Sequence, residues 1–193
     1  MNPITLQDLM TLEGYDKARH SFRQAVMVRK KNRLAPIGPD VVLSFEDRTT
    51  ILYQIQEMLR AERITDPERI QDELDVYNSL IPGPGELVAT LFIEITNQEQ
   101  IKSRLSELAG VEDSIRLAVG NSFTVSALGE DGRTSNGRTS SVHYLRFYLA
   151  PRVREEFHTL SSPATVFVNH PRYNVQSEIP LSMREELRGI LVP

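Results

Sequence analysis

ELVATLFIEI, residues 86–95, is the stretch that decides the class of fold. Leu87, Ala89, Leu91, Ile93 and Ile95 alternate along it, a period of two that is typical of a strand with one buried face. Before this stretch, apolar residues recur at helical spacing; after it, most apolar runs alternate. Helices followed by strands predict an α+β fold, with N-terminal helices packed on a mostly antiparallel sheet.

The breaker Pro82-Gly83-Pro84-Gly85 separates this strand from the helical part of the chain. Asp66 followed by Pro67 is a typical helix start. Gly14 is expected to separate the first two helices, and an extended segment is expected over 41–45. The helices predicted in this part span residues 5–12, 16–34, 47–63 and 67–77.

After residue 95, the clearest signal is a hairpin. Two alternating runs, 115–119 and 123–127, are joined by Gly120-Asn121, a dipeptide that favours a tight turn between antiparallel strands. Further strands are predicted over 141–149, 165–170 and 173–176, and helices over 98–108, 151–158 and 181–191.

The chain has 193 residues, which predicts a single domain over 1–193 with a mainly helical part, 1–82, and a mainly sheet part, 85–193. It contains no cysteine, which excludes disulfides, a thiolate nucleophile and cysteine-bound zinc or iron–sulfur clusters. No apolar run approaches the roughly 18 residues of a spanning helix, and the N-terminus lacks signal-peptide features. We therefore expect a cytoplasmic protein with no membrane span.

Charge is segregated along the sequence. Residues 17–33 carry seven basic residues and no acid, whereas 57–75 carries seven acids and three bases. The basic segment predicts an interaction surface, through pairing within the chain or with a partner protein; a small anionic ligand and nucleic acid are the alternatives. A net charge of −4 makes nucleic acid the least favoured of these. The candidate interaction residues are Arg23, Arg29, Lys30, Lys31 and Arg33.

A second candidate is the polar face of the helix predicted over 47–63. Tyr53, Gln56, Glu57 and Arg60 are spaced so that their side chains can touch. Such a set can form a pocket in which Arg60 anchors an anion and Glu57 acts as a base. A solvated face, or a buried ion-paired seam against the basic helix, is the commoner outcome for such a set, and the sequence leaves open whether the face over 54–60 is buried. The candidate pocket residues are Tyr53, Gln56, Glu57, Arg60, His143 and Arg146.

The histidines offer only weak metal candidates. His143 heads the apolar face of the strand predicted over 141–149, where a hydrogen-bonded core histidine is the commoner outcome. His143 and His170, joined by Glu57, could supply nitrogen and oxygen ligands. The chain lacks a helical Glu-x-x-His pattern and a Gly-x-Ser-x-Gly elbow. We therefore predict no metal, and the sequence decides neither a cofactor nor whether the protein is an enzyme.

Three stretches carry a resemblance to a known family: FEDRT (45–49) running into YQIQEMLR (53–60), ELDVYNSLIP (73–82) and TSSVHYLRF (139–147). In order and spacing they resemble the bacterial domain of unknown function 3501 family, over about residues 19–173. The family's genes often lie beside those of a rubrerythrin and a heterodisulfide-reductase-like iron–sulfur protein.

The resemblance implies no established activity. It implies an accessory protein that acts by protein interaction in a redox or oxidative-stress pathway, with rubrerythrin-type and iron–sulfur oxidoreductase proteins as partners. The oligomeric state stays open, a homo-oligomer included.

Overall fold

The computed structural model describes residues 1–130, 132–134 and 137–191. Six α-helices and nine strands lie within these residues, together with the short 3₁₀ turns η1 (Leu6–Asp8), η2 (Gln98–Gln100) and η3 (Val111–Ser114). The helices are α1 (Leu12–Lys31), α2 (Arg48–Ala61), α3 (Pro67–Asn78), α4 (Ile101–Glu107), α5 (Pro151–His158) and α6 (Leu181–Arg188). The strands are β1 (Leu34–Ile37), β2 (Val41–Phe45), β3 (Glu86–Ile93), β4 (Ile115–Val119), β5 (Phe123–Ser126), β6 (Leu128–Gly129), β7 (Val142–Tyr148), β8 (Ala164–His170) and β9 (Tyr173–Glu178).

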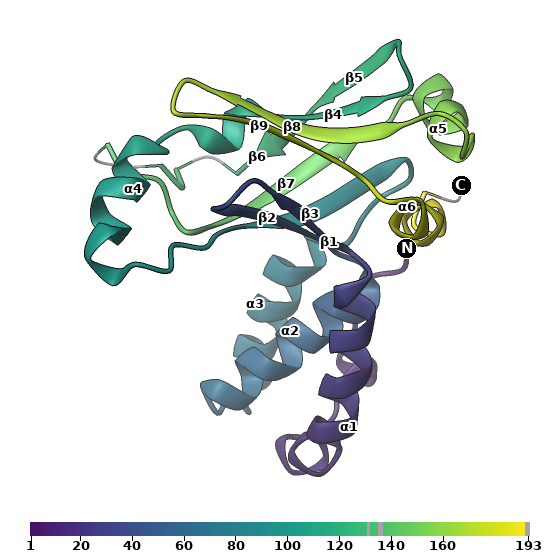
Figure 1. Cartoon of the computed structure of the whole chain (residues 1–193). Coiled ribbons are helices and arrows are strands. Elements are labelled where there is room, and N and C mark those ends of the chain that lie inside the picture. Colours follow the sequence, from purple (N-terminus) through teal and green to yellow (C-terminus); the bar gives the residue numbers. More distant parts are fainter. Residues whose placement is uncertain (131, 135–136, 192–193) are drawn as a thin grey trace.

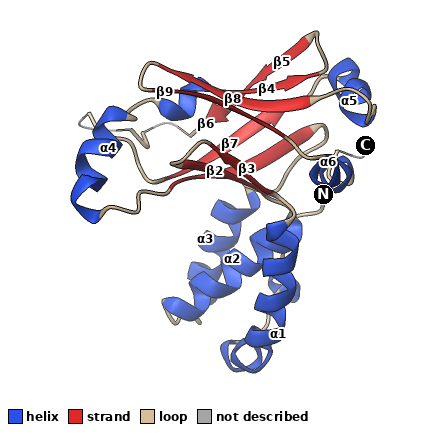
Figure 2. Ribbon diagram, viewed as in Figure 1, coloured by secondary structure: helices blue, strands red, loops and turns tan. Residues whose placement is uncertain are grey.

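The strands form two antiparallel sheets, one above the other (Figure 1). The first sheet has the order β1-β2-β3-β7-β6, and the second has the order β5-β4-β8-β9. Figure 2 shows α1, α2 and α3 grouped on the side of the first sheet that faces away from the second. The predicted α+β class is therefore confirmed, although the sequence predicted one sheet and the chain forms two.

Alternation along β3 and β7 builds the core between the sheets. Leu87, Ala89 and Leu91 are fully buried, as are Leu145 and Phe147 on the strand beside them. The register places Leu87 opposite Phe147 and Ala89 opposite Leu145, so the apolar faces of the two strands coincide. The predicted hairpin is also confirmed: β4 pairs with β5, and Gly120 has a positive φ of 59°.

A second, smaller core lies among the helices. Ile51, Ile55 and Leu59 on α2 meet Leu74 on α3 and Ile64 between the two helices. Their spacing along α2 is that of one helical face, as the apolar pattern of the sequence predicted.

The N-terminal boundaries differ from the prediction. Thr5 and Asp8 form the expected capping box, but the turn they cap contains only Leu6–Asp8. Gly14 does not interrupt the next helix: α1 begins at Leu12, where the Thr11 hydroxyl accepts a hydrogen bond from the Gly14 amide. A side-chain cap therefore decides where α1 starts, against the weak helix propensity of glycine.

The mainly helical part also contributes to the first sheet. Within residues 1–82, β1 and β2 form a hairpin, and β2 pairs with β3 from Val41↔Ile93 to Phe45↔Ala89. We propose from this pairing that the chain folds as one domain.

Tyr173 on β9 connects the β1–β2 hairpin to the second sheet through hydrogen bonds. Its hydroxyl donates to the carbonyl of Ile37 (2.5 Å) and accepts from the amides of Asp40 (3.0 Å) and Val41 (3.2 Å). Gly38, at a φ of 71°, lies so close that an added Cβ would be 2.7 Å from this hydroxyl. The two sheets are thus joined at one edge by a buried polar contact as well as by their shared core.

Within the described part of the chain, no helix combines the length and the apolar character needed to cross a bilayer.

Candidate functional site

The polar face of α2 is a seam against α1. Glu57 accepts hydrogen bonds from Arg19, from Nε to Oε1 and from Nη2 to Oε2 (both 2.7 Å), and from the hydroxyl of Tyr15 (2.6 Å). The contact with Arg19 holds the pKa of Glu57 below its ordinary value of 4.5, against the opposing effect of burial. Burial raises the pKa of the Tyr15 phenol. This carboxylate is therefore committed to an ion pair within the chain.

The other members of this face also contact the N-terminal segment. Gln56 is buried; its Oε1 accepts from the amide of Met10 (2.7 Å), and its Nε2 donates to the Met10 carbonyl (3.4 Å). Tyr53 packs edge-on against Phe22, with ring centroids 6.0 Å apart. Arg60 donates from Nε to Oδ1 of Asp16 (2.5 Å). Of the arrangements that the sequence left open, the structure has the ion-paired seam.

The structure does not bring the six candidate pocket residues together. Tyr53, Gln56, Glu57 and Arg60 line the α1–α2 seam. His143 lies on the buried inner face of the first sheet, and Arg146, on the opposite face of β7, pairs with Glu86 (Nη1 to Oε2, 3.0 Å). The cause is the period of a strand: His143 and Arg146 are three residues apart and point to opposite faces.

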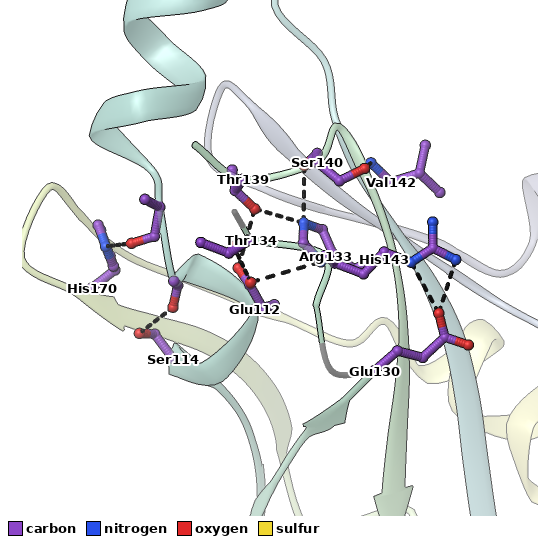
Figure 3. A network of polar contacts seen from close by, with 12 residues as sticks. Glu112, Ser114, Glu130, Arg133, Thr134, Thr139, Ser140, Val142, His143 and His170 are labelled. Carbon is purple, nitrogen blue, oxygen red and sulfur yellow. Dashed lines mark hydrogen bonds and ion pairs between the residues drawn. The ribbon is translucent and has the colours of Figure 1, made fainter. Parts of the chain in front are cut away.

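His143 belongs to a buried polar network at one end of the sandwich (Figure 3). Its Nε2 is 2.7 Å from Oγ1 of Thr139 and 2.9 Å from the carbonyl of Ser140. Its Nδ1 is 3.9 Å from Oε1 of Glu112, a carboxylate that accepts hydrogen bonds from Thr134 and Thr139. Glu112 comes from η3, so the network joins the start of the second sheet to the segment before β7. Glu112, Thr139 and His143 are buried and Thr134 is half-buried, and we assign the network to packing.

His170 contacts a different group, because its Nε2 is 3.1 Å from the carbonyl of Ala109. The weak metal candidates His143, His170 and Glu57 are thus held by three separate sets of partners. Among the residues the structure describes, no group of three or more histidine, aspartate or glutamate side chains is placed to hold a metal ion.

The basic residues of 17–33 lie on two faces of α1, except Arg33, which comes just after the helix. On the inner face, Arg29 and Arg33 both contact Oδ2 of Asp47, and Lys30 lies 3.6 Å from Oε1 of Glu46. Glu46 and Asp47 are buried, so these cations neutralise charges that would otherwise be very unfavourable. Three of the five candidate interaction residues therefore serve the fold.

Asp47 is the centre of this inner cluster. Its Oδ1 accepts from the amide of Thr50 (2.9 Å), which caps α2, and its Oδ2 accepts from Nε of Arg29 (2.6 Å) and Nη1 of Arg33 (2.7 Å). Burial acts to raise the pKa of Asp47, but the Thr50 amide and the two guanidinium groups outweigh it and hold this pKa below 3.8. The acids that neutralise the basic segment are thus mainly Glu46 and Asp47 rather than the 57–75 stretch.

The outer face of α1 carries the other two candidates. Arg23 and Lys31 are exposed and form no ion pair with any residue that the structure describes. Between them, Gln24, Met27 and Val28 complete a stripe at helical spacing, and Val28 is 67% exposed. Sequence reasoning missed this stripe, although apolar residues on both sides of a helix surrounded by basic ones were an available signal.

Together these contacts define an α+β protein in which a charged helical layer covers one sheet of a two-sheet sandwich. The chain belongs to the family of proteins of unknown function DUF3501, whose model matches residues 3–191. A crystal structure of a protein of unknown function from Burkholderia pseudomallei K96243 is similar, with a TM-score of 0.92 and 37% identity. The match covers 99% of this chain and 100% of that one. No curated protein matches the chain.

Proposed function

We propose that this chain is an accessory protein that docks onto an acidic surface of a partner protein through the outer stripe of α1: Arg23, Gln24, Met27, Val28 and Lys31. The observation that carries the proposal is the exposure of Val28 between two cations that have no acidic partner among the described residues. The other basic residues of the segment form ion pairs within the chain, so on the outer face of α1 these two charges are the ones available to a partner protein.

The composition of the stripe suits protein recognition. Met27 and Val28 offer apolar contact at its centre, and Arg23 and Lys31 flank them as exposed charges. Flanking charges of this kind steer association and set specificity, while central apolar contacts exclude water. Arg23 and Lys31 are eight residues apart, or roughly 12 Å along the helix, which is a short docking patch.

The partner class comes from the family resemblance. Rubrerythrin-type and iron–sulfur oxidoreductase proteins are the partners it implies, and they would place the protein in a redox or oxidative-stress pathway. Nucleic acid is a weaker alternative, because Arg29, Lys30 and Arg33 are engaged internally and the net charge is −4.

Reversing both flanking charges is expected to weaken partner binding at least about tenfold, since two attractive contacts become repulsive ones. The variant is Arg23→Glu with Lys31→Glu, measured by quantitative pull-down with a purified rubrerythrin-type or iron–sulfur oxidoreductase protein. Wild-type binding should also weaken as salt rises.

A matched control changes the net charge equally at a distance from the stripe. Lys102 on α4 and Arg172 in the β8–β9 turn are exposed, and Lys102→Glu with Arg172→Glu should leave binding unchanged. Equal loss in both double variants would contradict a localised docking surface, and so would full binding after reversal of the stripe.

A further inference from the structure

A polar cavity of about 580 Å³ lies where the C-terminal end of α1, the start of α2 and α6 meet. Figure 1 shows α6 beside the N-terminus and near this end of the helical layer. The charged and amide side chains that line it are Arg29, Asn32, Arg33, Asp47, Glu185 and Glu186. The cavity therefore combines residues that are far apart in the sequence, with cations from one side and carboxylates from the other.

Arg33 forms the base of this cavity and is only 2% exposed. Its Nη1 donates to Oδ2 of Asp47 (2.7 Å), and its Nη2 lies 3.4 Å from Oε2 of Glu186, a long contact. Its Nε is buried and has no hydrogen-bond partner among the residues described. A buried guanidinium with an unused donor is unfavourable unless an acceptor reaches it.

At this base the guanidinium groups outnumber the carboxylates that lie within 3 Å of them. Arg29 and Arg33 share a single oxygen of Asp47, whose other oxygen is occupied by the amide of Thr50. Apart from the long contact with Glu186, one carboxylate thus faces two guanidinium groups. Planar guanidinium groups bind carboxylates and phosphates in paired hydrogen bonds, so this base is suited to an anionic group.

The α6 wall has the opposite character. The side chain of Glu186 is 40% exposed, and its one ion pair among the described residues is the 3.4 Å contact with Arg33. Glu185 is exposed and forms no ion pair with any described residue. A ligand anion that replaces Glu186 at Arg33 would leave two carboxylates facing the same cavity, where a cationic group is favoured.

We infer that the cavity binds a small zwitterion. Its carboxylate or phosphate lies between Arg29 and Arg33, and its ammonium group lies toward Glu185 and Glu186. The Glu186 carboxylate, 3.4 Å from Arg33, lies at part of this anion position. This ligand site is distinct from the docking stripe on the outer face of α1 and does not depend on it.

Two matched pairs of probes test the inference by isothermal titration calorimetry. Phosphoethanolamine is compared with monoethyl phosphate, and β-alanine with propionate; each pair differs by the ammonium group. In at least one pair we expect the zwitterion to bind about tenfold or more tightly, the effect of one added charge-assisted contact. The pair that responds decides whether the anion is a phosphate or a carboxylate.

Variants assign the two ends of the ligand. Glu185→Gln with Glu186→Gln should abolish the preference for the zwitterion, and because both side chains are at the surface this variant should remain folded. Arg29→Gln should weaken binding of the preferred zwitterion, whereas Arg23→Gln, the same change on the outer face of α1, should not. Circular dichroism and urea unfolding verify that each variant is folded.

The inference is overturned if none of the four probes binds at millimolar concentration. It is also overturned if both members of each pair bind equally, or if the preference survives removal of both carboxylates. None of these outcomes affects the docking proposal, which concerns a different face of α1 and a protein partner.

Discussion

Replacing Asp47 with alanine is expected to lower the free energy of unfolding by about 3–5 kcal/mol, because breaking a buried ion pair leaves its partner charge without compensation. Arg33 is that partner, and its side chain is 3% exposed. The same substitution removes the cap of α2, which alone costs about 1 kcal/mol. The loss would approach the whole stability of a small domain, about 5–15 kcal/mol. Urea unfolding followed by circular dichroism measures it.

Two further substitutions separate these effects. Asp66 caps α3 by accepting hydrogen bonds from the backbone amides of Glu68 and Arg69, and no arginine side chain among the described residues pairs with it. Asp66→Ala should therefore cost only about 1 kcal/mol, the effect of the cap. Asp47→Asn keeps a capping oxygen but loses the charge and should fall between the two alanine variants. If Asp47→Ala and Asp66→Ala cost the same, the ion-paired cluster contributes nothing.

Arg184→Ala is expected to cost a similar amount, about 3–5 kcal/mol, since it deletes a large buried side chain and removes donors from buried carbonyls. Arg184 is 2% exposed and lies over the ring of Phe157, 5.0 Å from its centroid. It donates to the carbonyls of Phe157 (2.5 Å) and Thr159 (3.1 Å) and to that of Ser162. Burial lowers the pKa of this guanidinium, which is held by carbonyl oxygens at the end of α5.

Arg188 on the same helix is the control for Arg184. Its Nε lies 3.2 Å from Nδ1 of His158, and it is only partly buried. Arg188→Ala should change the unfolding free energy by less than about 1 kcal/mol, as is usual for surface contacts. A small effect of Arg184→Ala would show that α6 is held in place by its apolar contacts alone. The charged cavity would then not depend on this arginine.

Much of the fold was predictable because local patterns decide it. The alternation of Leu87, Ala89 and Leu91 matches the buried face of β3, and the Gly120-Asn121 turn lies where the hairpin was predicted. The helix start at Asp66-Pro67 is also confirmed. These signals depend on neighbouring residues, whose geometry follows from backbone and side-chain preferences.

The division into two sheets was not predictable in the same way. It depends on which strands pair, and the pairing of β3 with β7 joins residues such as Leu91 and His143, which α4 and two strands of the second sheet separate along the chain. Alternation shows that a strand has a buried face but does not identify the strand beside it. The sequence also predicts a loop over 129–140, rich in glycine and hydroxyl residues, and its residues 131, 135 and 136 lie outside the described residues.

The candidate sites were also only partly predictable, because local patterns do not identify the partners of a side chain. The spacing of Gln56 and Glu57 placed them on one polar face, but only the packing of α1 shows that Met10 and Arg19 satisfy them. The contact between Arg33 and Glu186 spans 153 positions, and no local pattern signals it. The sequence therefore shows which charged residues share a face of a helix, but not which of them pair with each other within the chain.

We propose that α1 has one face whose charges are neutralised within the chain and one face that is available to a partner protein. The most direct measurement is the urea unfolding free energy of Arg29→Glu compared with Lys31→Glu. Both residues lie in the last turn of α1, so the effect of the helix dipole is common to both. Arg29→Glu places a second carboxylate beside buried Asp47 and should cost at least about 2 kcal/mol more than Lys31→Glu. If the two substitutions lower the unfolding free energy equally, or if Lys31→Glu lowers it more, this division of α1 into two faces is contradicted.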